Sequence, residues 1–342
     1  MLLGTFAYYT SAGLLQEISL RQLDALAESK KRDLNKVYES WEDKLRLVRS
    51  RVQLRHSIRD YIETDSADAL TVIERTIQGI TVALPKIDKL IVLDLDGEEI
   101  ASAGRSKVMH PAASFDSDVS YVGTFLTGDG LRVALITGVE LDGVLVGGIE
   151  IIFDASDVVD VTSDYTGLEE TGEALVVMRD KEKLLVLNSL RYKVEGFSSE
   201  QVMAVASEDM SKVFEPAEVS PAEEHTDYRG EQVWLATRYL EKPGWGLVVK
   251  VDVSEEEKRA DVLREALFDI AVALSAFAII GGALLGFYLA RPIQELAVIV
   301  ERMRHGESGL RAEVKGDDEI AYLSESLNEF LDDIEDQQGG NA

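Results

Sequence analysis

Hydrophobic residues in the N-terminal part of the chain are spaced as they are on one face of a helix. Between residues 17 and 62 they recur mostly every three or four positions, with no Gly or Pro between them, at Leu20, Leu23, Leu26, Leu34, Val37, Trp41, Leu45, Val48, Val52 and Ile58. This spacing predicts one long helix. Residues 67–84 carry a second helical pattern, which should end at Pro85 because proline cannot continue a helix.

Short apolar runs separated by turn residues follow the helical part and predict antiparallel strands. Tight hairpin turns are expected at the dipeptides Asp96-Gly97, Asp142-Gly143 and Arg229-Gly230. A second set of strands is expected within residues 174–188, 231–240 and 244–253. The order of elements is therefore one long helix followed by two sets of strands with short helices.

Two groups of aspartates in this region have a structural interpretation and a metal-binding one. Asp94, Asp96 and Gly97 begin like a calcium loop, but the later ligands and the bidentate Glu are missing. Asp154 and Asp157 fit the N-cap and N3 positions of a short helix better than a pair of ligands. We therefore expect no metal site.

A long uncharged run lies near the C-terminal end. From Ile270 to Ala290 no residue is charged, and at about 1.5 Å rise per residue this segment crosses a hydrocarbon layer of roughly 30 Å. A core helix of a soluble domain is seldom apolar on all faces over such a length. The run predicts a transmembrane helix.

The first 16 residues are also uncharged, but they are short for a membrane span and include polar Thr and Ser. They lack the basic start and cleavage site of a signal peptide. We interpret residues 1–16 as the outer part of a first transmembrane helix, which would place residues 17–269 on one side of the membrane and residues 291–342 on the other.

Two further apolar stripes follow the membrane segment. Their residues alternate three and four apart, as in a coiled-coil seam, at Ile293, Leu296, Val300 and Met303 and then at Ile320, Leu323, Leu327, Phe330 and Ile334. The connector between the stripes holds three glycines and two isolated apolar residues, Leu310 and Val314. Pro292 suits the first turn of a helix. Two such short helices cannot cover both stripes alone, so we expect a homodimer in which they form a parallel four-helix bundle.

The segment 291–337 resembles the HAMP signalling domain. A proline follows the membrane span, a glycine-containing connector joins two helices, and the second helix starts with Asp318, Glu319 and Ile320, where the family usually has Asp-Glu-Ile-Gly; here Ala321 replaces the glycine. The resemblance implies a cytoplasmic signal relay formed by Pro292, Ile293, Leu296, Val300, Met303, Glu319, Ile320, Leu323, Leu327 and Phe330.

The charge of the chain excludes some partners. The 63 acidic residues against 35 basic ones give a net charge of −28, which opposes binding to nucleic acid, and 46% hydrophobic residues allow a real core. There is no cysteine, so no disulfide, thiolate nucleophile or Cys-ligated zinc is expected.

The region before the membrane span resembles the double Cache (dCache) sensor module, in which two PAS-like lobes are stacked on a long helix. The phrases "GLEETGEALVV" at 167–177 and "KPGWGLVVKVD" at 242–252 carry this resemblance. It implies an α+β fold outside the cytoplasm, with a helical stalk at 17–85, a distal lobe at 86–160 and a proximal lobe at 161–255. A juxtamembrane helix at 256–269, the span at 270–290, the HAMP domain and a tail at 338–342 complete the expected order.

In such modules the ligand usually lies on the concave face of the distal lobe. Here Tyr121, Arg132 and Asp154 offer an aromatic ring, a cation and a carboxylate, which together could hold the stem, carboxylate and ammonium of an amino acid. The Arg-x-Trp-Tyr stretch of the amino-acid-binding branch is missing, so that branch's residue assignments do not transfer. A structural role for each of the three residues remains the alternative.

The sequence shows no catalytic site. The four histidines, His56, His110, His225 and His305, lie far apart, and there is no phosphate-binding loop, nucleophile elbow or cyclase signature. We expect a non-enzymatic, cofactor-free receptor in a bacterial inner membrane, which binds a small amino acid, carboxylate or similar ligand outside and relays the signal to an output module. One alternative is an anchored module that docks a protein such as a solute-binding protein; another is the input part of an enzyme whose catalytic part lies elsewhere.

Overall fold

The computed structural model describes residues 2–108, 114–180, 183–192, 212–214 and 224–339. Within it the chain divides into two compact units, one formed by residues 11–260 and the other by residues 261–342 with 1–10.

The first unit begins with helices. Helix α1 runs from Leu2 to Arg49, and the expected single helix over residues 17–62 is wrong, because the chain breaks at Ser50 and Arg51 before α2 (Val52–Thr64). Arg51 is extended, and its amide closes back onto Val48 at 3.2 Å. The break carries no Gly or Pro, and the apolar spacing runs through it, so the sequence pattern gave no sign of it.

Helix α3 (Ala67–Ala83) confirms the second helical pattern. Its first turn is capped by Ser66, whose hydroxyl accepts a hydrogen bond from Ala69 N at 3.3 Å. Its buried residues, Ala69, Ile73, Ile77 and Ile80, share one face and belong, except for Ala69, to the same core as α1.

The distal lobe is a five-stranded antiparallel sheet. Its strands are β1 (Ile87–Leu93), β2 (Glu99–Gly104), β3 (Ser120–Thr127), β4 (Gly130–Leu141) and β5 (Val144–Asp154), in the order β2-β1-β5-β4-β3. The turn at Asp142-Gly143 is a two-residue hairpin loop in which both residues have positive φ, 53° and 79°. The turn at Asp96-Gly97 is also confirmed, and Asp94 closes it by accepting hydrogen bonds from the amides of Asp96 and Glu98.

Helix α4 (Ser156–Ser163) leads to a proximal lobe of the same design. Its strands are β6 (Glu173–Asp180), β7 (Lys183–Val186), β8 (Glu224–Thr226), β9 (Gln232–Leu240) and β10 (Trp245–Asp252), in the order β7-β6-β10-β9-β8, and a 3₁₀ turn spans Lys212–Phe214. The expected turn at Arg229-Gly230 joins β8 to β9. The two sheets thus share one topology, which confirms the expected pair of antiparallel lobes.

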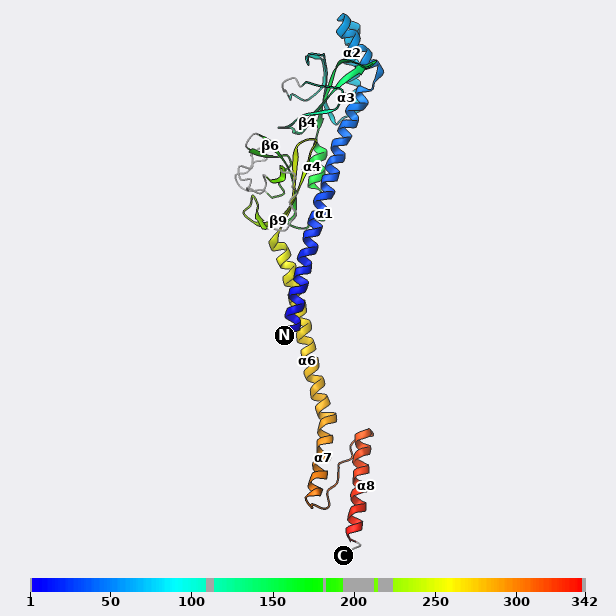
Figure 1. Ribbon diagram of the computed structural model, residues 1–342, viewed down its shortest axis with the longest axis vertical. Coiled ribbons are helices and arrows are strands. Elements are labelled where there is room, and N and C mark those ends of the chain that lie inside the picture. Colours follow the sequence, from blue (N-terminus) through cyan, green and yellow to red (C-terminus); the bar gives the residue numbers. More distant parts are fainter. Residues whose placement is uncertain (1, 109–113, 181–182, 193–211, 215–223, 340–342) are drawn as a thin grey trace. The chain divides into compact units, whose positions relative to one another are not determined.

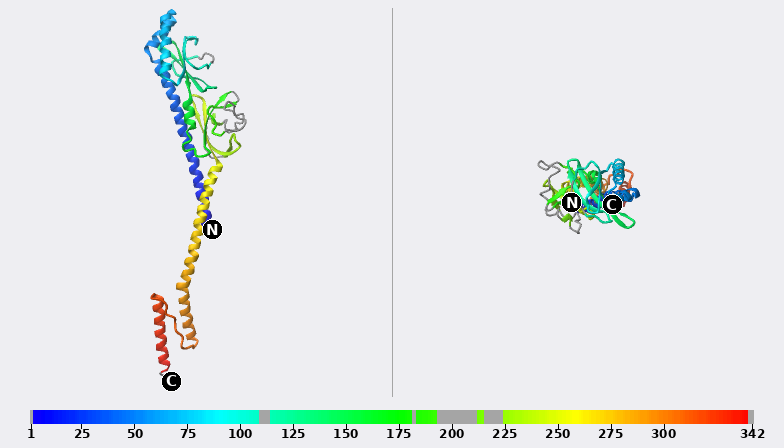
Figure 2. Two further views of the ribbon diagram at one scale, coloured as in Figure 1. Left: turned by 180° about the vertical axis from the view of Figure 1, so that it is seen from behind. Right: turned by 90° about the horizontal axis from the view of Figure 1, so that it is seen from above.

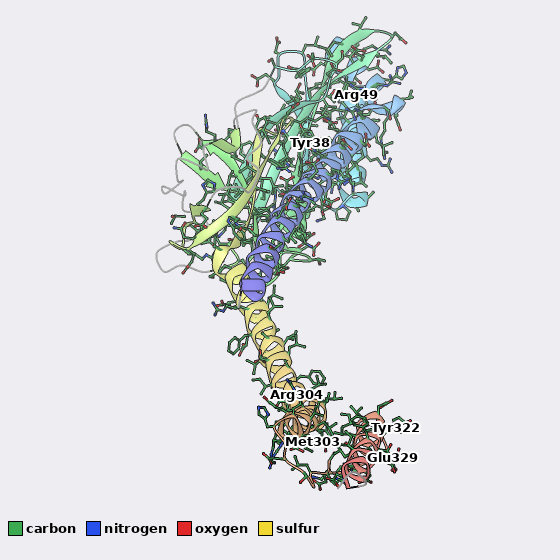
Figure 3. The ribbon with its side chains drawn as sticks, turned by 60° about the horizontal axis from the view of Figure 1, so that its bottom comes forward. Tyr38, Arg49, Met303, Arg304, Tyr322 and Glu329 are labelled. Carbon is green, nitrogen blue, oxygen red and sulfur yellow. The ribbon has the colours of Figure 1, made fainter. Side chains whose placement is uncertain are left out.

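One hydrophobic core joins both lobes to α1. Leu34, Tyr38, Trp41 and Leu45 of α1 pack with one face of the distal sheet and one face of the proximal sheet. Figure 1 and the left view of Figure 2, which is seen from behind, both show α1 lying along the two sheets. Tyr38 and Arg49 mark this helix beside the distal strands in Figure 3, and Arg49 Nη1 donates to Thr137 Oγ1 at 3.0 Å.

In the second unit one continuous helix connects the membrane segment to the C-terminal part. Helix α6 starts in the first unit at Val253 and reaches Leu285, a π-helical turn covers Gly286–Ala290, and α7 covers Arg291–Arg304. Pro292 lies in the first turn of α7, as expected, although the helical backbone continues into α7 from α6. Arg291 N bonds to Gly286 O, five residues back, and this wider turn accommodates a proline that has no N–H to donate. Helix α8 (Glu319–Gly339) follows the connector.

Candidate functional site

The outer face of the distal sheet, which points away from α1, has an apolar floor. Alternate residues of β4 divide between the two faces: Leu131, Val133 and Leu135 enter the α1 core, and Ala134 and Ile136 join the outer cluster. That outer cluster is formed by Ile91, Leu93, Ala134, Ile136 and Ile152, with Val108, Phe115, Val122 and Phe125 packed against it. Arg132 and Asp154, two of the three residues expected to bind a ligand, alternate with the α1-facing residues and therefore lie on this face.

Charged groups lie at one end of this face. Arg132 Nε is 2.6 Å from Asp88 Oδ2, and Arg132 Nη1 is 3.9 Å from Asp154 Oδ1. Arg132 and Asp154 are register partners on neighbouring strands. The register of β1 shifts between Ile87 and Lys89, at Asp88. Arg105 also pairs with Asp88, at 3.7 Å, so the cluster carries two cations and two carboxylates, of which Asp88 and Arg132 are buried.

Asp154 is an ionised member of this cluster. Burial alone would raise the pKa of its carboxyl, but hydrogen bonds from Ser156 and the charge of Arg132 outweigh burial and hold the pKa below its ordinary value. The N-cap position of α4 is Ala155, so the expected N-cap role of Asp154 is wrong by one residue, although its carboxylate does accept from Ser156 N at 2.9 Å. Asp157 pairs with Lys86 at 2.9 Å.

The structure does not bring Tyr121 to the other two predicted ligand residues. Tyr121 pairs with Leu135 and packs against the α1 core, so its ring lies on the opposite face of the sheet from Arg132 and Asp154. Its hydroxyl is 2.5 Å from Thr124 Oγ1, and burial raises its pKa. Ligand binding by Arg132 and Asp154 stays a prediction.

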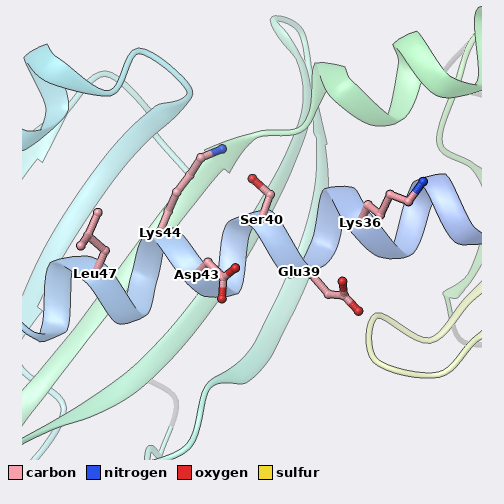
Figure 4. Close-up of a pocket in the computed structure, with 6 residues that line it drawn as sticks. All are labelled: Lys36, Glu39, Ser40, Asp43, Lys44 and Leu47. Atoms are coloured by element: carbon pink, nitrogen blue, oxygen red, sulfur yellow. The ribbon is translucent and has the colours of Figure 1, made fainter.

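A surface hollow of about 400 Å³ lies elsewhere, along α1. It is lined by Lys36, Glu39, Ser40, Asp43, Lys44 and Leu47, all of which project from this one helix (Figure 4). A hollow bounded by a single helix surrounds a ligand on one side only, so we do not assign it a ligand.

The proximal lobe buries a charge network that the sequence pattern did not indicate. Lys250 Nζ lies 3.1 Å from Glu173 Oε2 and also pairs with Asp227, and all three side chains are at most 1% exposed. Tyr228 donates its hydroxyl to Glu173 at 2.9 Å, and Arg229 pairs with both Asp227 and Asp252. Each of these buried charges therefore has a partner of opposite charge, as burial requires, on the face of the lobe that points away from α1.

In the second unit, the helix Asp261–Arg304 is the one stretch of the described chain that is long and apolar enough to cross a membrane. Residues 2–16 form the start of α1, and the assignment of residues 1–16 as part of a first span stays a prediction.

The apolar stripes of α7 and α8 are only partly covered within one chain. Leu296 is buried, whereas Ile293, Val300, Leu323 and Phe330 remain 51%, 45%, 53% and 60% exposed. The buried face of α8 is offset by one residue from the predicted stripe and consists of Ala321, Ser324 and Leu331. The exposed apolar residues on the two helices are therefore available to a further helix.

The connector is fixed to α8 by side chains of α8. Asn328 Oδ1 accepts from Ala312 N at 2.7 Å, and Asn328 Nδ2 donates to Ala312 O at 2.8 Å. Glu335 accepts from Gly309 N at 2.7 Å and pairs with Arg311 at 3.0 Å. Arg311 lowers the pKa of Glu335, so this carboxylate is charged at neutral pH. Asn328 and Glu335 of α8 thus hold the connector backbone at two places.

Comparison with known proteins identifies this C-terminal region. Residues 284–336 match the HAMP domain family, beginning within the apolar run rather than at Arg291. The chain therefore contains a HAMP domain directly after a helix of membrane-spanning length. No curated protein matches the chain.

Solved structures resemble about 71–73% of the chain at low sequence identity. They include the extracellular domain of a protein described as a histidine kinase, vpHK1S-Z8 (12% identity, TM-score 0.49, 71% of this chain and 98% of that one). The ligand-binding domain of the Pseudomonas fluorescens chemoreceptor CtaA with L-isoleucine gives 11% identity and a TM-score of 0.47 over 73% of this chain and 99% of that one. The sensory domain of the Campylobacter jejuni chemoreceptor Tlp3 with isoleucine has 9% identity and a TM-score of 0.45, over 72% of this chain and 97% of that one. At these values the assignment of two lobes on a long helix rests on the strand order and register of this chain itself.

Proposed function

We propose that this chain is the input part of a homodimeric transmembrane receptor. The two lobes lie outside the cytoplasm of a bacterial cell and bind a small ligand, α6 crosses the inner membrane, and the HAMP domain passes the change to an output module. The chain itself carries no catalysis in this proposal.

The observation that carries this proposal is the exposed apolar stripe in the HAMP domain. Ile293 and Val300 project from α7, which continues without interruption from α6, and Leu323 and Phe330 project from α8, which follows the connector. Large exposed apolar side chains are unfavourable in water, and a second copy offers the same stripe for a self-complementary four-helix bundle. A repacking of that bundle is the switching element, with Pro292 and Glu319 at the starts of its two helices.

Disulfide crosslinking tests this arrangement, because the natural chain has no cysteine. Single substitutions Ile293→Cys and Val300→Cys should crosslink rapidly across the dimer in membranes, and Gln294→Cys, which faces away from the stripe, should not. Leu296→Cys should be slower than its two neighbours on the stripe, because Leu296 is already buried against its own chain. Equal rates at positions 293, 294 and 300 would exclude the bundle.

For the ligand we propose a zwitterion such as an amino acid at the outer face of the distal lobe. The apolar floor suits an aliphatic stem, Arg132 offers a cation to a carboxylate, and Asp88 with Asp154 offers negative charge to an ammonium. The pairs among these three groups must rearrange on binding, so the ligand would exchange one set of ion pairs for another.

The probe for this site is a panel of the common amino acids and short carboxylic acids, added singly to the full chain in nanodiscs. A ligand at 100 times its Kd should stabilise the fold by about 2.7 kcal/mol, which is measurable as a thermal shift. Asp154→Asn should abolish that shift, and Asp160→Asn, an exposed carboxylate on α4, should leave it intact. A shift that survives Asp154→Asn and Arg132→Gln would place the ligand elsewhere.

A further inference from the structure

A short loop in front of β6 has an unusual backbone. Gly167 and Glu169 both have positive φ, 79° and 55°. Glu169 is one of only three non-glycine residues of the described chain with a positive φ. Such residues cost conformational energy and persist where the surroundings require them. After Glu169, the amides of Glu170 and Thr171 point to one place, as in the backbone concavities that bind anions.

The anion in this concavity is the carboxylate of Glu255. It accepts hydrogen bonds from Glu170 N at 3.1 Å and Thr171 N at 2.9 Å, and also from the hydroxyl of Thr171. Glu255 is buried and lies in the first turn of α6, which begins at Val253 directly after β10. Two backbone amides and one hydroxyl on a buried carboxylate form a strong, charge-assisted contact.

The carbonyl groups of the same loop are held from the other side by the proximal lobe. Arg191 donates to Glu169 O at 3.1 Å and to Gly172 O, and Tyr192 donates its hydroxyl to Glu170 O at 2.6 Å. Arg191 also stacks over the ring of Tyr165 at 4.2 Å. The loop is therefore clamped between residues 191–192 of the lobe and the first turn of α6.

A third contact fixes the junction between strand and helix. Asp252 N, at the end of β10, donates to Thr171 Oγ1 at 3.1 Å, so this one hydroxyl accepts from β10 and donates to Glu255 of α6. Displacement of the loop would disturb both groups at once.

We propose that Glu255 is a positioning residue that connects the proximal lobe to α6 through the loop 167–172, which binds its carboxylate. This inference rests on the proposed function, because α6 continues along the chain into the membrane-length helix and the HAMP domain. A rearrangement at residues 191–192 shifts the loop, the loop releases or reorients the Glu255 carboxylate, and the first turn of α6 moves with it. The loop carries the change because its amides bind α6 and its carbonyls bind the lobe.

Two roles of Glu255 can be told apart by experiment: it could only stabilise the proximal lobe, or it could connect the loop 167–172 to α6. Loss of a structural residue weakens the lobe as a whole, whereas loss of a connection frees the loop and α6 and leaves the sheet protected. Hydrogen exchange of single amides separates the two cases, since it reports local opening and global unfolding separately.

The first experiment measures amide exchange in the full chain in nanodiscs, comparing the natural chain with Glu255→Ala and Glu255→Gln. Exchange at Glu170 and Thr171 should accelerate at least about tenfold in Glu255→Ala, because the carboxylate that accepts both amides is gone. The amides of β6 and β10 should keep their rates. The control is Glu265→Gln, which removes one exposed charge from the same helix.

Thr171 supplies a second, matched pair of variants. Thr171→Val keeps the shape but removes the hydroxyl that both Asp252 N and Glu255 use, and Thr171→Ser keeps the hydroxyl. Only Thr171→Val should accelerate exchange at Asp252 and Thr171, and Thr171→Ser should behave as the natural chain.

The last readout links the contact to the HAMP domain. Glu255→Gln should change the crosslinking rate at Val300→Cys at least about fivefold relative to Glu265→Gln, the lower end of typical coupling between sites. Equal rates in these two variants, unchanged exchange at Glu170 and Thr171, or equally accelerated exchange in β6 and β10 would each overturn the proposal. If Val300→Cys fails to crosslink even without a second change, the receptor proposal itself fails.

Discussion

Gly143 and Gly79 are both exposed glycines, but an added methyl group should have opposite effects at the two positions. Gly143 lies in a hairpin turn with φ of 79°, and Gly79 lies within helix α3. Apart from the residues next to each glycine in its own turn or helix, no heavy atom of the described chain lies within 4 Å of a Cβ built at either position. Gly143→Ala should lower the free energy of unfolding by about 1 kcal/mol, because an L side chain is strained at positive φ. Gly79→Ala should raise it by roughly 0.5–1 kcal/mol through helix propensity. Denaturant unfolding of the two variants in parallel checks the signs, and a stabilising Gly143→Ala would contradict the turn.

Asp227 should make the proximal lobe sensitive to acid. Burial alone would raise its pKa, but hydrogen bonds and charges from Lys250 and Arg229 outweigh burial and hold the pKa below the ordinary value. A lowered folded pKa gives stability that is present above the unfolded value of about 4 and is lost as the pH falls through the folded pKa. The natural chain should therefore lose stability as the pH falls below about 4.

The variant Asp227→Asn tests this residue directly. It should be less stable at pH 7 by about 1–3 kcal/mol, because Lys250 and Arg229 lose a charged acceptor, and its stability should fall less steeply with acid. Denaturant unfolding at a series of pH values measures both effects. Asp160→Asn, which removes an exposed carboxylate, is the control and should keep the natural pH dependence.

The turns and strands that the sequence predicted depend on local chemistry, and the residues that it missed depend on distant partners. Asp142-Gly143 sets its own turn whatever surrounds it. Lys250, between Val249 and Val251, has the pattern of a solvent-facing strand residue, but it is buried beside Asp227 and Glu173, which are distant in sequence. Strict alternation would place Asp88 on the face of Leu90, and the register shift at Asp88 brings its carboxylate to Arg132 instead.

At the scale of elements, Asn328 of α8 holds the connector of the HAMP domain at Ala312. Asn328→Ala removes both hydrogen bonds to Ala312, so the backbone N–H and C=O of Ala312 lose these partners. This loss should lower the free energy of unfolding by about 1–3 kcal/mol. Amide exchange at Ala312 should therefore accelerate strongly. Glu329→Ala, the exposed neighbour on α8 (Figure 3), is the control and should leave Ala312 protected. Protection of Ala312 in Asn328→Ala would show that other contacts hold the connector.

Element boundaries were predictable where a residue type enforces them. Ser66 caps α3, and the helix ends just before Pro85, as expected. The break after Arg49 was not predictable, because the apolar spacing continues through it. The continuity of α6 into α7 was not predictable either, because Pro292 lies at the start of α7. In both cases hydrogen bonding that no single residue type signals decides the outcome: a closing turn at Arg51 and a π turn before Pro292.

For the whole of the first unit, residues 11–260, the shared core implies that the two lobes unfold together. Trp41 of α1 stacks on Phe153 of the distal lobe at 5.9 Å and meets Trp245 of the proximal lobe edge-on at 6.5 Å. Trp245 Nε1 also donates across the lobes to Thr124 Oγ1 at 3.1 Å. Such contacts make the stability of each sheet depend on the other.

Substitutions at Trp41 test this dependence. Trp41→Ala leaves a cavity among both lobes and should destabilise the unit by about 3–5 kcal/mol, with exchange accelerated equally in β5 and β10. Trp41→Phe should cost much less, because the ring keeps most of the packing and the indole N–H that it removes has no hydrogen-bond partner within the described chain. If Trp41→Ala accelerates exchange in one sheet and spares the other, the lobes are independent bodies on a common helix. A ligand on the distal lobe would then have no route to β10 through the core, and α6 would have to receive the signal along α1.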